Sequence, residues 1–521
     1  MTFYKSIQPG LILTALFLLT ANTSRAEEAG DSLSGRNEIV YEVNFTGGGS
    51  TGTFAPYLLG SNSMGRHAMK ATAETSGIIY KDFDRSKRFS WTAGADMAVS
   101  YQSSAVYDRY LESADKWSTH KWNPSRATIY QLWAGLKYRC LMLWAGMREH
   151  TSPIVDDRLS SGDLILSNNA RAIPQVEAGF IDFQDIPFTK GWVQITGAIS
   201  YGKYTDSNAL KQRFNYWNSH ITTGQLFTYK RIHFRTRTDR PFSVTVGIQL
   251  GGEFGGTTYR YNEGKLTQVE KNGQSFNSFM QMIIPKLRSR DGFVEGNHIG
   301  TWDFKGRYKF KNGSELEGYF QWIWEDGSGM AKRNMTDGLW GLSFTFANEN
   351  APLKKVVAEY IDMSDQSGPI HWAPSDAPGT SIGTEATGGD NYYNNTTFNA
   401  WANYGLSLGS SFPVGPLYNT DGYPQFRHNR TRGFQLGALG NICPTVEWTA
   451  KFSYAAAGGT GRVPIARTLK NTSAMVSIGW DASKLLKGLR VNGSLGFDAG
   501  SLRGHSFGAL LKVSYTGAFN L

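Results

Sequence analysis

The chain has 521 residues and a net charge of +10, with 18% charged residues, 13% aromatic residues and two cysteines. So many aromatic and so few charged residues exclude an intrinsically disordered chain, and two cysteines exclude a disulfide-stabilised scaffold. Outside the N-terminus no stretch approaches the roughly 20 apolar residues of a membrane-spanning helix, which excludes a polytopic helical membrane protein.

The first 26 residues have the layout of a secretory signal peptide. Lys5 precedes an apolar run at residues 11–20, and small residues at Ser24 and Ala26 fit cleavage after Ala26. The run is too short to span a bilayer stably. We therefore expect an exported protein whose mature part, residues 27–521, forms a single domain.

From residue 38 onward, apolar residues recur at every second position, as they do in strands with one apolar face. In residues 89–101, for example, every odd-numbered position is apolar or aromatic. The same pattern, with occasional exceptions, predicts strands at residues 38–46, 130–138, 141–147, 192–204, 225–235, 242–250, 301–311, 315–325, 338–347, 400–409, 433–439, 446–455, 472–480 and 506–521.

The length and the polarity of these segments favour a membrane barrel over a soluble sandwich. Most segments reach the roughly 9–11 residues of a membrane-crossing strand, whereas sandwich strands have about 5–6. Aromatic residues near segment ends, such as Tyr130 and Tyr138, fit the girdles of an outer-membrane barrel. The other face carries Lys, Glu, Gln and Asn, which suits a wet lumen. The pattern predicts an all-β, transmembrane antiparallel barrel closed by residues 506–521 against residues 38–46.

Long polar segments between the strands predict loops, with the long ones on one side of the barrel. They lie at residues 112–125, 206–223, 259–274, 348–355 and 374–395, and the first has room for a short helix. We expect Cys140 and Cys443 to lie on strands and to stay unpaired.

Residues 504–508 (GHSFG) match the G-x-S-x-G nucleophile elbow of hydrolases. That elbow needs a strand, a turn and a helix, followed by an acid and a histidine, and residues 509–521 contain no Asp, Glu or His. We therefore expect a turn into the last strand and no catalysis by Ser506. The nine histidines show no H-x-x-x-H spacing, and the basic residues are scattered. Neither a metal site, a cofactor nor nucleic-acid binding is predicted.

Several blocks, taken in their order, give the chain a resemblance to a known family. They are residues 161–176 (SGDLILSNNARAIPQV), 296–303 (GNHIGTWD), 325–329 (EDGSG) with 337–341 (DGLWG), 359–369 (EYIDMSDQSGP) and 390–395 (DNYYNN) before Trp401. From about Phe54 to its end, the chain resembles the Wzi family of capsule-assembly outer-membrane proteins, in the form found in Bacteroides-like bacteria. One departure is Ala172, where the family pattern has Pro.

The resemblance implies a barrel of about 18 strands in the outer membrane of a Gram-negative cell, in contact with lipid and lipopolysaccharide. It also implies a non-catalytic role in attaching or organising capsular or exopolysaccharide. Neither the sugar nor the oligomeric state follows from it. Aromatic faces beside amide and carboxyl groups suit sugar binding, and the best local cluster for it is Asp390, Asn391, Tyr392, Tyr393 and Trp401.

Two alternatives stay open at this point. The first explains the motif residues as a polar network that plugs the lumen, because buried polar groups in a barrel need hydrogen-bond partners. That network would contain Asn168, Asn169, Arg171, Asp365 and Gln366. The polar inward face alternatively fits an outer-membrane porin or solute channel.

Overall fold

The computed structural model describes residues 38–283, 296–369 and 388–520. The predicted signal peptide at residues 1–26 lies outside the described residues. Among those residues, none of the helices has the length and apolar character that a membrane-crossing helix needs.

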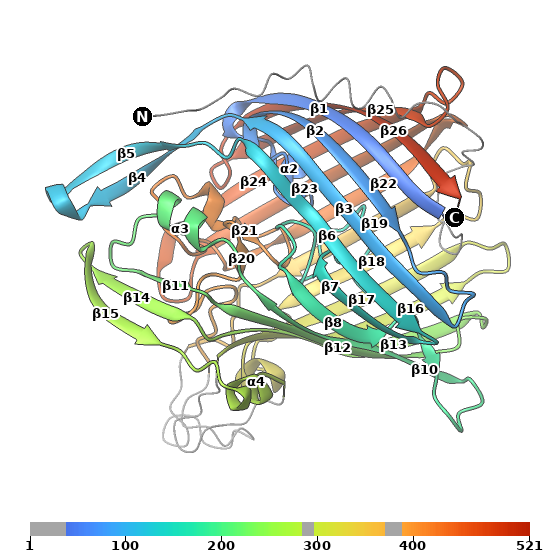
Figure 1. Ribbon diagram of the computed structural model, residues 1–521, viewed down its shortest axis with the longest axis horizontal. Coiled ribbons are helices and arrows are strands. Elements are labelled where there is room, and N and C mark those ends of the chain that lie inside the picture. Colours follow the sequence, from blue (N-terminus) through green and yellow to red (C-terminus); the bar gives the residue numbers. More distant parts are fainter. Residues whose placement is uncertain (1–37, 284–295, 370–387, 521) are drawn as a thin grey trace.

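The largest sheet is a closed antiparallel barrel of 18 strands (Figure 1). The short strands β8 (Gln175–Phe180) and β9 (Gln184–Asp185) both pair with β10 (Val193–Lys203) and form one interrupted wall strand. β1 (Glu38–Phe54) pairs with β26 (Ser506–Asn520) in a register that runs from Glu38 opposite Asn520 to Ser50 opposite Gly508. The predicted fold and the predicted closing pair are both confirmed.

The remaining wall strands follow one another around the barrel in chain order. They are β2 (Met69–Lys81), β3 (Phe89–Gln102), β6 (Arg126–Tyr138), β7 (Leu141–Met147), β12 (Leu226–Thr236), β13 (Phe242–Phe254), β16 (Asn297–Lys309), β17 (Glu315–Trp324), β18 (Gly338–Thr345), β19 (Lys355–Asp362), β22 (Thr431–Cys443), β23 (Val446–Gly459), β24 (Pro464–Asp481) and β25 (Leu489–Gly500). β2, β8, β19 and β25 were not among the predicted strands. In β2 the outward positions carry mainly Ala, Thr and Gly, which leaves little apolar alternation to detect.

The outer surface of the wall is an apolar band. In β24, for example, Val476, Ile478 and Trp480 are 43–50% exposed, and the residues between them are serine and glycine. Large apolar side chains on the outward faces of successive strands are typical of a lipid-facing surface. The alternation that predicted the strands therefore reports which side chains face lipid.

The two ends of the barrel differ (Figure 1). We call the end with Glu38 and Asn520 the terminal end, and its connections are short turns. The opposite end, the loop end, carries the β4–β5 and β14–β15 hairpins and most of the short helices. These elements are α2 (Tyr57–Gly60), β4 (Ala105–Leu111), η1 (Glu112–Ala114), β5 (Lys116–Trp122), α3 (Ser207–Arg213), β11 (His220–Thr223), β14 (Thr257–Asn262), β15 (Lys265–Lys271), α4 (Phe276–Ile283) and α5 (Gly327–Met330).

Three details of the connections differ from the prediction. Residues 112–125 and 259–274 are largely strands of hairpins, although η1 is the predicted short helix. Residues 348–355 lie at the terminal end, between β18 and β19, and so do not join the long loops. Cys140 lies in the turn after β6 and not on a strand, whereas Cys443 is the last residue of β22; both are unpaired, as expected.

Two connections fold into the barrel and fill its interior. The first plug segment, residues 148–174, joins β7 to β8, and the second plug segment, residues 388–430, precedes β22. The second includes β20 (Ala402–Asn403), β21 (Leu406–Ser407) and η2 (Pro416–Tyr418). Their apolar side chains share one core inside the wall, with Leu164, Ile165, Trp401, Phe412 and Phe426 at most 1% exposed.

The prediction of a wall strand at residues 400–409 is therefore wrong. This stretch forms the small β20–β21 hairpin within the plug (Figure 1). Its apolar residues face the plug core and not lipid, which produces a similar pattern in the sequence.

Candidate functional site

Asp163 fixes the first plug segment to the barrel wall. Its Oδ2 accepts hydrogen bonds from Gln249 Nε2 of β13 at 3.0 Å and from Gln321 Nε2 of β17 at 2.9 Å. It also accepts one from Ser152 Oγ at 2.6 Å, while Oδ1 accepts from the Ile165 amide at 2.9 Å. Asp163 and both glutamines are at most 1% exposed. Charge-assisted hydrogen bonds of this kind are strong when buried, so the carboxylate holds the plug in one position.

A second buried carboxylate completes this network from the wall. Asp303 of β16 accepts hydrogen bonds from His233 of β12 at 2.7 Å, from Gln249 at 2.8 Å and from Gln321 at 3.3 Å. Tyr229 donates to Gln249 Oε1 at 2.5 Å. The sequence prediction missed these wall residues, although Asp303 ends the 296–303 block. The sequence signal that could have revealed them is a set of polar residues at the inward positions of neighbouring strands.

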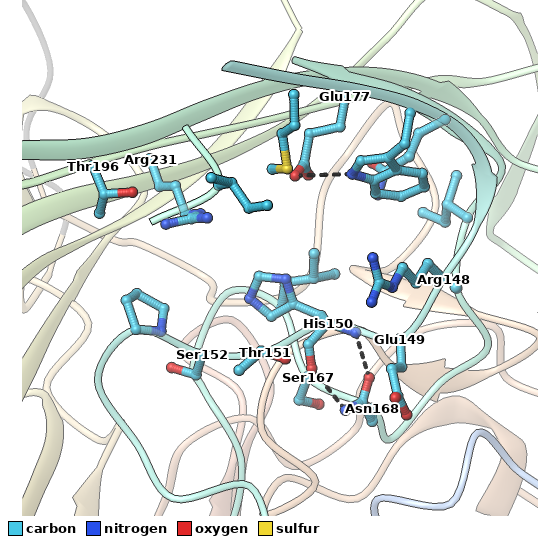
Figure 2. Close-up of a pocket in the computed structure, with 18 of the residues that line it drawn as sticks. Arg148, Glu149, His150, Thr151, Ser152, Ser167, Asn168, Glu177, Thr196 and Arg231 are labelled. Atoms are coloured by element: carbon cyan, nitrogen blue, oxygen red, sulfur yellow. Dashed lines mark hydrogen bonds between the residues drawn. The ribbon is translucent and has the colours of Figure 1, made fainter. Parts of the chain in front are cut away.

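Three of the five predicted lumen residues lie in the first plug segment and make contacts within the plug. Asn168 exchanges two 2.8 Å hydrogen bonds with the backbone of His150, within the first plug segment (Figure 2). Asn169 Nδ2 donates to the Ser407 carbonyl of the second plug segment at 3.2 Å. The Arg171 guanidinium lies 4.4 Å from the centre of the Tyr404 ring. The contacts of Asn169 and Arg171 join the two plug segments to each other.

The other two predicted lumen residues belong to a separate group near the loop end. The backbone amides of Asp365 and Gln366 donate to the Asp337 carboxylate at 3.1 and 2.7 Å. Gln366 Nε2 donates to the Met363 carbonyl at 3.2 Å. Here the acceptor Asp337, which the sequence prediction did not single out, organises the turn.

The predicted sugar-binding aromatics lie inside the plug core. Tyr392, Tyr393 and Trp401 are at most 1% exposed. The Tyr393 hydroxyl donates to the Leu164 carbonyl at 2.6 Å, and Trp401 Nε1 donates to the Ile165 carbonyl at 2.8 Å. In this packing the three rings offer no open face for stacking, and Tyr393 and Trp401 connect the second plug segment to the first. Their contact with sugar stays a prediction.

Asp390 and Asn391 meet a group of acids beneath the loop end. Asp390 Oδ2 accepts from Ser367 Oγ at 2.6 Å, and the Asn391 amide donates to Glu325 Oε2 at 3.0 Å. Burial, with a contribution from the nearby Asp326, raises the pKa of Asp390 to about 8. Burial also raises the pKa of Glu325 well above its usual range. Asp390 is therefore largely protonated at neutral pH.

An exposed aromatic cluster lies at the loop end, outside the plug. Tyr110 of β4, Trp117 of β5 and Trp217 have ring centres 4.6–5.8 Å apart, and Trp117 is 50% exposed. The Tyr110 hydroxyl donates to the carboxylate of Asp115, which is exposed, and Glu112 is also exposed in the same hairpin. We call Tyr110, Trp117 and Trp217 the rim cluster. The sequence prediction treated these segments as plain loops, although two tryptophans in polar segments were a usable signal.

No family profile matches the chain, and no curated protein matches it by sequence. Among solved structures, the chain is similar to Wzi of Escherichia coli, an outer membrane protein involved in group 1 capsule assembly and a carbohydrate-binding β-barrel. That similarity has a TM-score of 0.53 and 13% identity, over 91% of this chain and 83% of Wzi. The chain also matches OccK3 of Pseudomonas aeruginosa, with a TM-score of 0.44 and 13% identity over 92% of this chain and 96% of that chain. OprD of the same organism matches with a TM-score of 0.44 and 8% identity over 95% and 98%. The chain thus has the fold of outer-membrane β-barrels.

Proposed function

We propose that this protein is a non-catalytic outer-membrane barrel that binds carbohydrate and attaches or organises capsular or exopolysaccharide at the cell surface. The observation that carries the proposal is a lumen filled by a hydrogen-bonded plug in a barrel that displays aromatic side chains at its loop end. Similarity in fold to Wzi, which binds carbohydrate, supports the same function. The apolar band supports a location in the outer membrane, with the loop end facing outward.

The rim cluster supplies the chemistry that sugar binding needs. The C–H face of a pyranose ring packs against an exposed aromatic ring, and its hydroxyl groups donate to carboxylates. Trp117 offers such a ring, and Glu112 and Asp115 offer carboxylates in the same hairpin. In this proposal the predicted cluster of Asp390, Asn391, Tyr392, Tyr393 and Trp401 is the framework beneath the binding surface.

The porin alternative rests on the polar inward face of the wall. In this structure that face pairs with the plug, as Gln249 and Gln321 do with Asp163. We therefore expect purified protein to give no steady, large conductance in planar bilayers. A steady, large conductance would favour the channel function.

The direct test is binding of the polysaccharide from the producing strain to purified protein. Trp117→Ala is expected to weaken binding about tenfold, which corresponds to a loss of about 1.4 kcal/mol. Trp192→Ala is a matched control, because Trp192 is 54% exposed and lies in a turn at the terminal end. In cells, a deletion strain is expected to synthesise its polysaccharide but to retain less of it. Normal retention, or equal binding by Trp117→Ala and wild type, would contradict the proposal.

A further inference from the structure

A cavity of about 480 Å³ lies between the first plug segment and the wall strands β7, β8, β10 and β12 (Figure 2). Its lining includes Asp82, Arg85 and Asp182, which lie in turns at the terminal end and are accessible to solvent. The cavity therefore opens at the end opposite the rim cluster, and the proposed function does not use it. Cavities of this volume are typical of small-molecule sites.

The acids at the mouth of the cavity already have cationic partners. Arg148 pairs with Asp82 at 3.0 Å, and Arg85 pairs with Asp182 at 3.3 Å. Deeper in the cavity, Glu177 accepts a hydrogen bond from Trp144 Nε1 at 3.3 Å (Figure 2). In the described part of the chain, none of these carboxylates forms an ion pair with an arginine of the opposite wall, although Glu177 lies near enough to Arg231 for their charges to attract.

That wall, strand β12, presents two arginines to the cavity. Arg235 Nε donates to the neutral side chain of Gln194 at 2.8 Å, and its guanidinium lies over the Phe183 ring at 3.9 Å. Among the described residues, Arg231 has no hydrogen bond or ion pair, and its guanidinium points into the cavity (Figure 2). A buried or half-buried guanidinium without an anionic partner is costly, and a bound carboxylate or phosphate would satisfy it bidentately.

Glu149, beside Arg148, and Arg171 complete the charged part of the lining, and the remaining side chains are neutral and suited to hydroxyl groups. His150 lies at the centre of the view in Figure 2, and its buried Nε2 has no hydrogen-bond partner. Burial lowers the pKa of His150 to about 4, so the imidazole is neutral at pH 7 and presents a donor or an acceptor. Thr196 adds a hydroxyl beside Arg231, and Trp144 and Phe227 add aromatic surface.

We propose that this cavity is a binding site for a small anionic saccharide that enters from the terminal end. The carboxylate or phosphate of the ligand pairs with Arg231, and its hydroxyls bond to His150 and Thr196. The aromatic lining packs against its ring. The site is thus distinct from the polysaccharide-binding surface, in both position and charge.

The test is isothermal titration of purified full-length protein with glucuronate, glucose 1-phosphate and glucose. At least one of the two anions is expected to bind ten or more times tighter than glucose, and the tighter of the two identifies carboxylate or phosphate as the recognised group. Arg231→Met is expected to weaken anion binding at least tenfold. Arg231→Lys keeps the charge without the bidentate geometry, so its affinity for the anion is expected to lie between those of the wild type and Arg231→Met.

Arg237→Met is the matched control, because Arg237 lies in the turn after β12 and pairs with Asp239 outside the cavity. Heat-modifiable migration on a gel shows whether each variant is a folded barrel. Glucose binding as tight as anion binding, equal affinity of wild type and folded Arg231→Met, or no binding of either anion would overturn the proposal. Trp117→Ala is expected to leave anion binding unchanged, which separates this site from the proposed function.

Discussion

Removing the Asp163 carboxylate is expected to release the first plug segment from the wall. Gln249 and Gln321 would keep their hydrogen bonds to Asp303, whereas Ser152 and the Ile165 amide would lose the acceptors that Asp163 provides. An unsatisfied buried donor costs about 1–3 kcal/mol, so two of them cost about 2–6 kcal/mol. Asp163→Ala is therefore expected to destabilise the plugged state by about this amount, while the barrel stays folded.

Single-channel recording in planar bilayers measures this effect directly. An emptied barrel of 18 strands leaves an aqueous channel. Wild-type protein is expected to be closed, and Asp163→Ala is expected to show frequent openings. Asp163→Asn keeps one acceptor oxygen without the charge and is expected to open less often.

Asp239→Ala is the matched control, because Asp239 is exposed in the turn between β12 and β13. It is expected to conduct no more than the wild type. A folded Asp163→Ala barrel that remains as closed and as protease-resistant as the wild type would refute the role of Asp163 as the plug anchor.

Three further predictions concern the acids, the plug packing and the lipid face. Because the folded protein raises the pKa of Asp390 to about 8, it binds this proton more tightly than the unfolded chain does, and stability is lost as pH rises toward and through 8. Hydrogen exchange of residues 390–430, corrected for intrinsic rates, is expected to be faster at pH 9 than at pH 6, and Asp390→Asn is expected to reduce that difference. A Cβ at Gly251 would lie 2.4 Å from the Trp401 ring, so Gly251→Ala is expected to destabilise the plug by about 1–3 kcal/mol and to increase channel openings; unchanged conductance would contradict this. Leu495, 54% exposed on β25, is expected to face lipid, and Leu495→Arg to cost about 2–4 kcal/mol in urea unfolding from vesicles, with Leu495→Ala as the control; an equal cost for both would argue against a lipid contact.

The wall was predictable because its pattern is local. In each lipid-facing strand, apolar outward residues alternate with polar inward residues within about ten positions. The closing pair follows from the amphipathic last strand. Where outward positions carry small residues, as in β2, the pattern fades and the strand was missed.

The plug was not predictable in the same way, because residues far apart in the sequence hold it together. Asp163 meets Gln321 158 positions later, and Leu164 meets Tyr393 229 positions later. The apolar residues that alternate around Trp401 give the same sequence pattern whether they face lipid or a plug core. The sequence therefore singled out residues of the second plug segment but could not show that their rings are enclosed.

The pairing of β1 with β26 has a consequence for biogenesis. The wall remains an open sheet with two unsatisfied edges until the last strand has been delivered, and exposed edges invite pairing with other chains. Ser167 of the first plug segment donates to the Leu408 carbonyl of the second, so two distant connections have to meet inside the same enclosure. Such long-range pairing is intrinsically slow. The unassembled chain is thus expected to depend on a periplasmic holdase, which would shield its edges until the seam between residues 38 and 520 is sealed.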